Sequence, residues 1–362
     1  QRARARQFWD VLKPVAEQLS TLDQLPVSEA SKLFKELQPT LDALFQAGFL
    51  EARMLHFLRI IGSAINGYVQ RRLAEVHLWT DPYRKVSKGL RDMCQIVDSW
   101  VADSTQLTGV FWPQMGTWKA GHFVDEVLGW LRTRMGEVLE MRAVVHQLSS
   151  ILSSTELAEL AVGDVFEPFA KLNALHHSPF SQPAWTAATS AFKQTMIPIE
   201  RVVARTLQAR FASSGLRGHA LLREFMRYQE LVRRELVFAE LAPARETLLG
   251  QLEQQLEQLR TDFESKTAYV GGGGGAKSSG AKLGKNLPEV VEHLVLAKQL
   301  GDKVGEISAA AEAILGDLQL MGRFRGKATE LGQYMADYQQ QFFSEWVAQV
   351  LAPLLPSRPP SP

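Results

Sequence analysis

The residues that most invite a chemical role lie in the stretch YVGGGGGAKSSGAKLGKNLPEVV, residues 269–291. Five consecutive glycines and a Gly-Lys pair could cradle a phosphate group with backbone amides. That chemistry needs a glycine, four further residues and then Gly-Lys-Ser/Thr. Here the Gly-Lys pair at Gly284 is followed by Asn286, and Ser279 stands where the first glycine is required. The stretch therefore predicts a flexible linker over residues 271–286 and not a nucleotide site.

Metal and nucleophile chemistry find no better support in the sequence. His176 and His177 are adjacent, so on regular structure they point in different directions and are poorly placed to hold one ion. Paired-cysteine zinc spacing, the His-Glu-x-x-His motif and the Gly-x-Ser-x-Gly elbow do not occur. Cys94, the single cysteine, is predicted to be a small buried residue on a helix. We therefore expect no catalytic, cofactor-binding or metal-binding residues in this chain, and no enzymatic activity of its own.

Composition narrows the classes of partner. The 362 residues include 40 lysines and arginines against 39 aspartates and glutamates, so the formal net charge is +1. This balance lacks the basic surplus of a nucleic-acid-binding domain, and no apolar run approaches the roughly 20 residues of a membrane span. One cysteine allows no internal disulfide, which suits a reducing compartment. The chain opens on Gln1 and stops in LLPSRPPSP, so we expect a fragment of a larger, cytoplasmic protein.

The elements that would position any site are helices. Apolar residues recur at steps of three and four over 51–78 and again from Phe123, while strand-like alternation is nearly absent. Ser153 begins a capping box with Glu156. Pro243 opens a helix with a bundle or short coiled-coil seam formed by Leu248, Leu252, Leu256, Leu259 and Phe263. The sequence therefore predicts an all-α, elongated chain of consecutive helical bundles.

The last long helix, predicted over residues 324–350, carries an aromatic stripe with a constant step of four. Its members are Tyr334, Tyr338, Phe342 and Trp346. Such a stripe is more often part of a core than a groove for a partner, and both interpretations stay open. Pro179 and Pro183 precede a further helix predicted to begin near Ala184, within an aromatic segment that we expect to pin one helical layer to the next.

These features divide the chain into five predicted segments. They are an N-terminal bundle at 1–122, a middle bundle at 123–270, the linker at 271–286, a C-terminal bundle segment at 287–355 and a Pro-rich end at 356–362.

Several stretches resemble dynein heavy-chain tails. They are LWTDPYRKVSKGLRDMCQIVDSW, FVDEVLGWLRTRMGEVLEMRAVVHQLSSILS, FEPFAKLNALHHSPFSQPAWTAATSAFKQTMIPIERVVARTL, GKNLPEVVEHLVLAKQLGDKV and YQQQFFSEWV. The third and fourth are the most specific, and they resemble the N-terminal tail of the heavy chain in the branch that serves intraflagellar transport, cytoplasmic dynein 2. The similarity covers residues 1 to about 350, and the pentaglycine stretch is an insertion relative to it.

The resemblance implies a non-catalytic scaffold: a rod of bundles, with the ATPase ring and the microtubule-binding stalk far downstream. It implies β-propeller intermediate chains, a light intermediate chain, a second heavy chain and intraflagellar transport train proteins as partners. It also implies location in the cytoplasm and the cilium or flagellum, at the axoneme, the basal body and the cytoskeleton. The alternative is a helical tethering or scaffold subunit unrelated to motors.

Glutamine-rich helix faces offer the candidate contact residues. QLEQQLEQLR and YQQQFF present amide donors and acceptors with little charge to desolvate, which suits a large, partly hydrated interface. We predict that an intermediate-chain propeller docks on the C-terminal half, from about Leu216 onward. The candidate contacts are Gln254, Gln258, Gln340 and Gln341. The competing interpretation is that these faces simply meet water.

Overall fold

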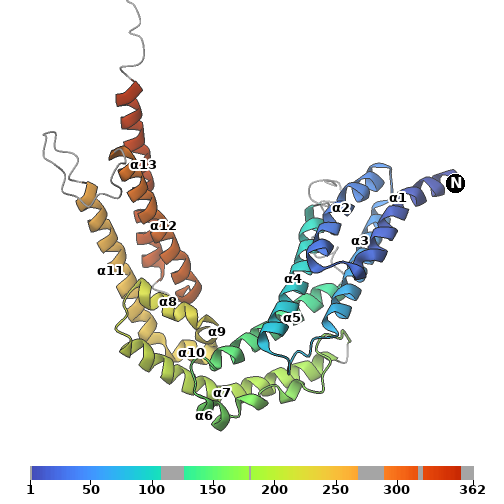
Figure 1. Ribbon diagram of the computed structural model, residues 1–362, viewed down its shortest axis with the longest axis horizontal. Coiled ribbons are helices and arrows are strands. Elements are labelled where there is room, and N and C mark those ends of the chain that lie inside the picture. The colour runs from blue at the N-terminus through green and yellow to red at the C-terminus, as the bar shows by residue number, and fades with distance from the viewer. Residues whose placement is uncertain (1, 107–125, 179–180, 268–288, 317–320, 352–362) are drawn as a thin grey trace, which may run out of the picture. The chain divides into compact units, whose positions relative to one another are not determined.

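A computed structural model describes most of the chain as helix, in residues 2–106, 126–178, 181–267, 289–316 and 321–351 (Figure 1). Within these ranges every regular element is an α-helix or a short 3-10 helix, which confirms the all-α prediction. The chain groups into two compact units, residues 1–199 and 200–362. The predicted division into bundles at 122 and 270 is finer than this grouping and stays a prediction.

Three predicted features fall outside the described residues. They are the linker at 271–286, the Pro-rich end at 356–362 and Phe123, from which the second apolar series is predicted.

Unit 1 is built from five long helices, several short ones and the first part of a sixth long helix. In chain order they are α1 (Arg2–Thr21), η1 (Leu22–Gln24), α2 (Val27–Gln46), α3 (Glu51–Leu73), α4 (Tyr83–Gln106), α5 (Glu126–Leu148), α6 (Ser154–Glu159), η5 (Val162–Asp164), η6 (Glu167–Phe169) and α7 (Ser181–Ser213). Helix α4 packs against α2, α3 and α5. It buries Trp100, whose ring meets the edge of Phe34 from α2 at 5.7 Å.

Local signals explain several boundaries. Ser153 caps α6 through the predicted capping box: its side chain accepts from the Glu156 amide, and the Glu156 carboxylate accepts from the Ser153 amide. Helix α7 begins at Ser181, three residues before the predicted start, and includes Pro183 in its first turn. Proline is tolerated there because the first amides of a helix have no intrahelical acceptor.

An aromatic cluster joins α7 to the rest of unit 1. Trp185 lies 5.0 Å from Phe169, which stacks on Trp79 at 4.6 Å between ring centroids. Arg134 of α5 is 4 % exposed; its guanidinium lies 3.8 Å from the Trp185 ring and donates to Gln182 Oε1 at 2.8 Å. The expectation that this segment pins helical layers together is thus confirmed for α5 and α7.

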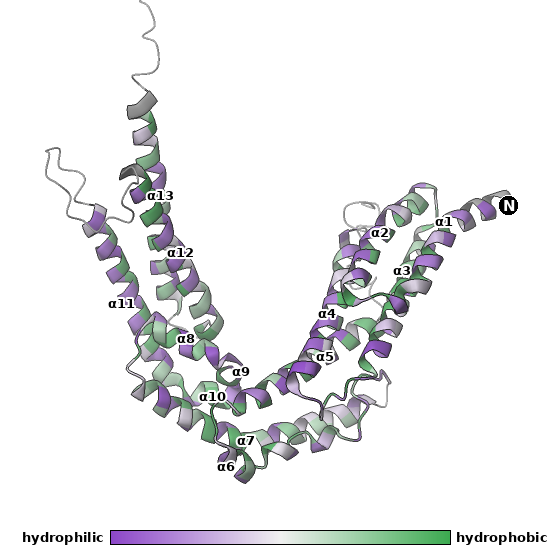
Figure 2. Ribbon diagram, in the orientation of Figure 1, coloured by the Kyte–Doolittle hydropathy of each residue, from purple (hydrophilic) through white to green (hydrophobic). Residues whose placement is uncertain are grey.

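Unit 2 contains the second part of α7 and six further helices. They are α8 (His219–Arg227), α9 (Gln229–Val232), α10 (Glu235–Glu240), α11 (Ala242–Thr267), α12 (Glu289–Leu315) and α13 (Met321–Leu351). Helix α11 begins one residue before Pro243, as the sequence predicts, and its Leu248–Phe263 seam is buried. Helices α12 and α13 pack together over most of their length and against α11. Hydrophobic and hydrophilic residues share every long helix, as burial of one face requires (Figure 2).

Candidate interaction surface

The glutamines of α11 divide into two groups that face different surroundings. Gln254 and Gln258, the predicted contact residues, are exposed. Gln251 and Gln255 are half-buried, and their side-chain oxygens accept from the backbone amides of Gly218 and His219 at 2.9 and 2.8 Å. Half of the QLEQQLEQLR amides therefore hold the first turn of α8, and the other half are open to a partner.

The same division occurs on α13. Gln340 and Gln341 are exposed, and the Gln341 amide donates to Glu345 Oε1 at 2.9 Å on the same helix. Gln339 instead donates to the Leu294 carbonyl of α12 at 3.2 Å. All four predicted residues thus lie at the surface of unit 2.

The four glutamines do not form one patch. Helices α11 and α13 run parallel, as ion pairs of Glu253 with Arg323 and of Arg260 with Glu330 show. Gln254 and Gln258 therefore lie level with residues 323–330 of α13. Gln340 lies at least ten residues farther along that helix, about 15 Å at 1.5 Å per residue. The structure presents an α11 amide patch and a separate α13 end.

The α13 end also exposes two aromatic rings. Phe343 is 50 % exposed and Trp346 is 39 % exposed, with ring centroids 6.2 Å apart. Earlier rings of the stripe pack inward: Tyr338 meets the edge of Phe263 at 5.0 Å, and Phe342 stacks on His293 at 4.8 Å. The stripe is therefore core at its start and surface at its end.

Helical geometry explains this split. A step of four advances 400°, so each ring is turned about 40° beyond the one before, and Trp346 lies about 120° away from Tyr334. The drift could have been recognised in the sequence. Phe343 is not among the predicted contact residues, because it lies outside the stripe although it follows Phe342 directly.

Charged groups surround the α11 amide patch with internal ion pairs. Lys327 pairs with Glu253 at 3.4 Å and Glu257 at 3.2 Å, and Arg260 pairs with Glu264 at 3.0 Å. The hydrogen bonds from Arg260 to Glu264 and Glu330 raise the pKa of its guanidinium. Because these carboxylates already have basic partners, the uncharged amides are the more available polar groups for an added chain.

The residues considered for chemistry, Cys94, His176 and His177, belong to unit 1. Cys94 is 6 % exposed on α4, as predicted, and burial raises the pKa of its thiol. Trp130 lies edge-on to His177 at 5.0 Å. Among the described residues, no group of three or more His, Cys, Asp or Glu side chains is placed to hold a metal ion. None of the described helices combines the length and apolarity that crossing a bilayer requires.

Comparison with known proteins gives the family. The chain is 36% identical over 363 residues to cytoplasmic dynein 2 heavy chain 1 of Tripneustes gratilla, covering 98% of this chain. It is 32% identical over 361 residues to the Homo sapiens protein of that name and 26% identical over 338 residues to that of Chlamydomonas reinhardtii. The chain spans 8% of the length of each of these relatives.

The family model described as dynein heavy chain, N-terminal region 1, matches residues 2–355. The resemblance found in the sequence segments is thereby confirmed across nearly the whole chain. The chain belongs to the dynein heavy-chain family and corresponds to N-terminal region 1 of these heavy chains.

Proposed function

We propose that this chain is a non-catalytic tail segment of the dynein heavy chain that drives retrograde intraflagellar transport. In this role it acts as a scaffold for heavy-chain pairing, for docking of intermediate and light intermediate chains, and for attachment to transport trains. The observation that carries the proposal is the similarity to cytoplasmic dynein 2 heavy chains over 98% of the chain. Membership in a motor family argues against the alternative of a tether unrelated to motors.

Location in the cytoplasm and the cilium, near the axoneme and basal body, follows from this role. The chain needs no cofactor for scaffolding. An ATPase assay on the purified chain tests the non-catalytic part of the proposal, because magnesium-dependent turnover above a buffer control would contradict it.

Docking of the intermediate-chain propeller is assigned to unit 2. The α11 amide patch supplies Gln254 and Gln258, and the α13 end supplies Gln340 and Gln341 beside Phe343 and Trp346. Exposed tryptophan and phenylalanine are typical anchors of protein interfaces, and uncharged amides make hydrogen bonds with a small desolvation cost. Both patches lie after Leu216, within the half of the chain predicted from sequence.

The experiment is co-purification of the tagged chain with purified intermediate and light intermediate chains. Gln254→Glu with Gln258→Glu, Gln340→Lys, and Phe343→Ala with Trp346→Ala are compared with a control, Gln194→Glu, at an exposed position of α7 in unit 1. Each new polar residue is a good helix former, so the helices remain intact. We expect the unit 2 variants to weaken capture of the intermediate chain and the control to leave it unchanged.

Two results would overturn the docking assignment. One is full capture by all unit 2 variants; the other is loss of capture by charge changes before Leu160 alone. If the unit 2 variants lose only the light intermediate chain, the docking site on unit 2 belongs to that subunit and not to the propeller.

A further inference from the structure

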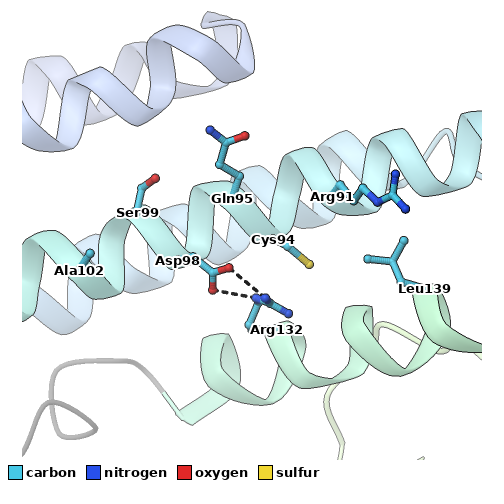
Figure 3. Close-up of a pocket in the computed structure, with 8 residues that line it drawn as sticks. All are labelled: Arg91, Cys94, Gln95, Asp98, Ser99, Ala102, Arg132 and Leu139. Carbon is cyan, nitrogen blue, oxygen red and sulfur yellow. Dashed lines mark hydrogen bonds and ion pairs between the residues drawn. The ribbon is translucent and has the colours of Figure 1, made fainter. Parts of the chain in front are cut away.

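A shallow hollow on unit 1 lies between α4 and α5 (Figure 3). Its volume is about 520 Å³, large enough for a leucine or phenylalanine side chain. The floor is formed by Cys94 of α4 and Leu139 of α5, Ala102 is exposed at one edge, and the Cys94 sulfur lies between Leu139 and Arg132. The hollow therefore offers an apolar seat within a polar rim.

The rim is basic and partly preorganised. Arg132 of α5 donates from Nε and Nη2 to the two Asp98 oxygens at 2.7 and 2.9 Å. This pair fixes the guanidinium at the edge of the hollow and leaves its Nη1 donors directed elsewhere, as a bidentate arginine can. Arg91 forms the opposite side of the rim, with Nη2 donating to the Tyr83 hydroxyl at 3.5 Å.

A basic stripe on α4 leads into this rim. Arg84, Lys88 and Arg91 are exposed and follow one another at steps of four and three, so they share a sector of about 60° that also contains Gln95. No described carboxylate lies within ion-pair distance of these three side chains.

The carboxylates near the stripe offset only part of this charge. Asp81 pairs with Lys85, Asp98 with Arg132, and Glu137 with Arg134. Asp92 is half-buried on α4 and Glu140 is exposed on α5, and neither has an ion-pair partner among the described residues. The three cations of the stripe outnumber these two carboxylates, so the stripe keeps a local positive field.

We propose that the hollow and the α4 basic stripe form a docking site for an acidic segment of another protein. A large apolar side chain of that segment enters the hollow over Cys94 and Leu139, and its carboxylates pair with Arg132, Arg91 and Lys88. Charge complementarity selects the acidic segment, and the apolar floor selects one that also carries an exposed leucine or phenylalanine.

Other classes of ligand fit these features less well. A nucleic acid would leave the apolar floor unused, and none of the described residues that line the hollow carries an aromatic ring for base stacking. A membrane surface needs a broad apolar face, whereas this seat accepts one side chain. These classes are therefore outcomes of the test and not part of the proposal.

The test measures binding of fluorescein-labelled peptides to the full chain by anisotropy. The probe has a central Leu-Leu pair flanked by glutamates; one matched peptide replaces the glutamates with lysine, and another replaces the leucines with serine. We expect the first to bind and both others to bind at least about tenfold more weakly. Binding of the first should also weaken as salt rises.

Variants assign the site. Lys88→Glu with Arg91→Glu should lower the affinity for the acidic peptide by about tenfold or more, because two attractive charges become repulsive. The matched control is Arg201→Glu with Arg205→Glu, two exposed arginines one turn apart on α7, and it should leave the affinity unchanged. Circular dichroism checks that both variants are folded.

The single cysteine gives a second readout in the unaltered chain. Bound peptide should slow maleimide alkylation of Cys94, whereas the serine peptide should not. The proposal is overturned if the acidic peptide fails to bind or fails to protect Cys94. Equal binding of the acidic and basic peptides, equal loss in the α7 control, or binding of an RNA oligonucleotide or phosphatidylserine vesicles in place of the peptide would also overturn it.

Discussion

Asp103 is a carboxylate that the fold buries at a cost. It is 5 % exposed on α4, and its Oδ2 has no hydrogen-bond partner among the residues that the structure describes. Burial raises the pKa of this group, and the charge of Lys35 only partly opposes the shift. An aspartate whose pKa is higher in the folded state destabilises that state once the pH exceeds its unfolded pKa of about 3.9.

Asp103→Asn should therefore raise the melting temperature at pH 7. The gain should shrink as pH falls through the folded-state pKa and disappear below the unfolded value, where both chains are neutral at this position. Thermal unfolding of the two proteins from pH 7 to about pH 3 measures this difference. A gain that is constant over that range would show that the amide acts through packing and not through charge.

Gly218 is required by its backbone. Its φ is +54°, and a Cβ there would collide with the Gln255 side chain. Gly218→Ala should lower the free energy of unfolding by about 1–3 kcal/mol. Gly250→Ala is the control because it lies inside α11 with open space around it, and it should stabilise the chain by about 1 kcal/mol. Denaturant titration distinguishes the two, and equal effects would contradict the argument.

At the scale of elements, the start of α8 depends on a different helix. Gly218 supplies no side-chain cap, and oxygens from Gln251 and Gln255 of α11 accept from the first amides instead. The glutamines therefore act as a cap in trans and fix α8 against α11.

Gln255→Ala should lower the free energy of unfolding by about 0.5–2 kcal/mol, the usual range for loss of an N-terminal cap. The neighbouring Gln254→Ala, which removes an exposed side chain, should change it by no more than about 0.5 kcal/mol. Chemical denaturation followed by circular dichroism compares them. A larger loss for Gln254 than for Gln255 would refute the capping assignment.

The helices could be predicted where the hydrophobic periodicity agrees with capping residues or a proline at the start of the helix. The capping box at Ser153, the proline start of α11 and the apolar seam of that helix appear in the structure as the sequence predicts. The roles of single glutamines could not be predicted, because Gln254 and Gln255 are neighbours of identical type. Which of them meets α8 depends on the packing of a loop more than thirty residues away.

The same limit applies to the hollow of unit 1. The spacing of Arg84, Lys88 and Arg91 could have been recognised as a basic stripe on one helix face. Arg132 belongs to another helix, and only the packing of α4 on α5 brings it to Asp98 and Cys94. A site formed by two helices cannot be predicted from the residue pattern of each helix alone. The register between the helices also decides which side chains meet.

At the scale of the molecule, the elongated shape predicted from sequence stays a prediction. A compact domain of this length would have a radius of gyration of about 21 Å. We expect small-angle X-ray scattering to give a clearly larger value for the monomer, and circular dichroism to show strand content well below the average for globular domains. A radius of gyration near the compact value would contradict the elongated shape. The circular dichroism spectrum tests the helical content separately.

Helix α7 is continuous over Ser181–Ser213 and contributes to both compact units. In unit 2 its Glu200 pairs with Arg234 at 2.7 Å, and in unit 1 its Trp185 lies in the aromatic cluster. Helical hydrogen bonds form cooperatively, so opening of one unit should fray α7 toward the other. The amides in the middle of α7 should therefore exchange with solvent deuterium at a rate set by the less stable unit.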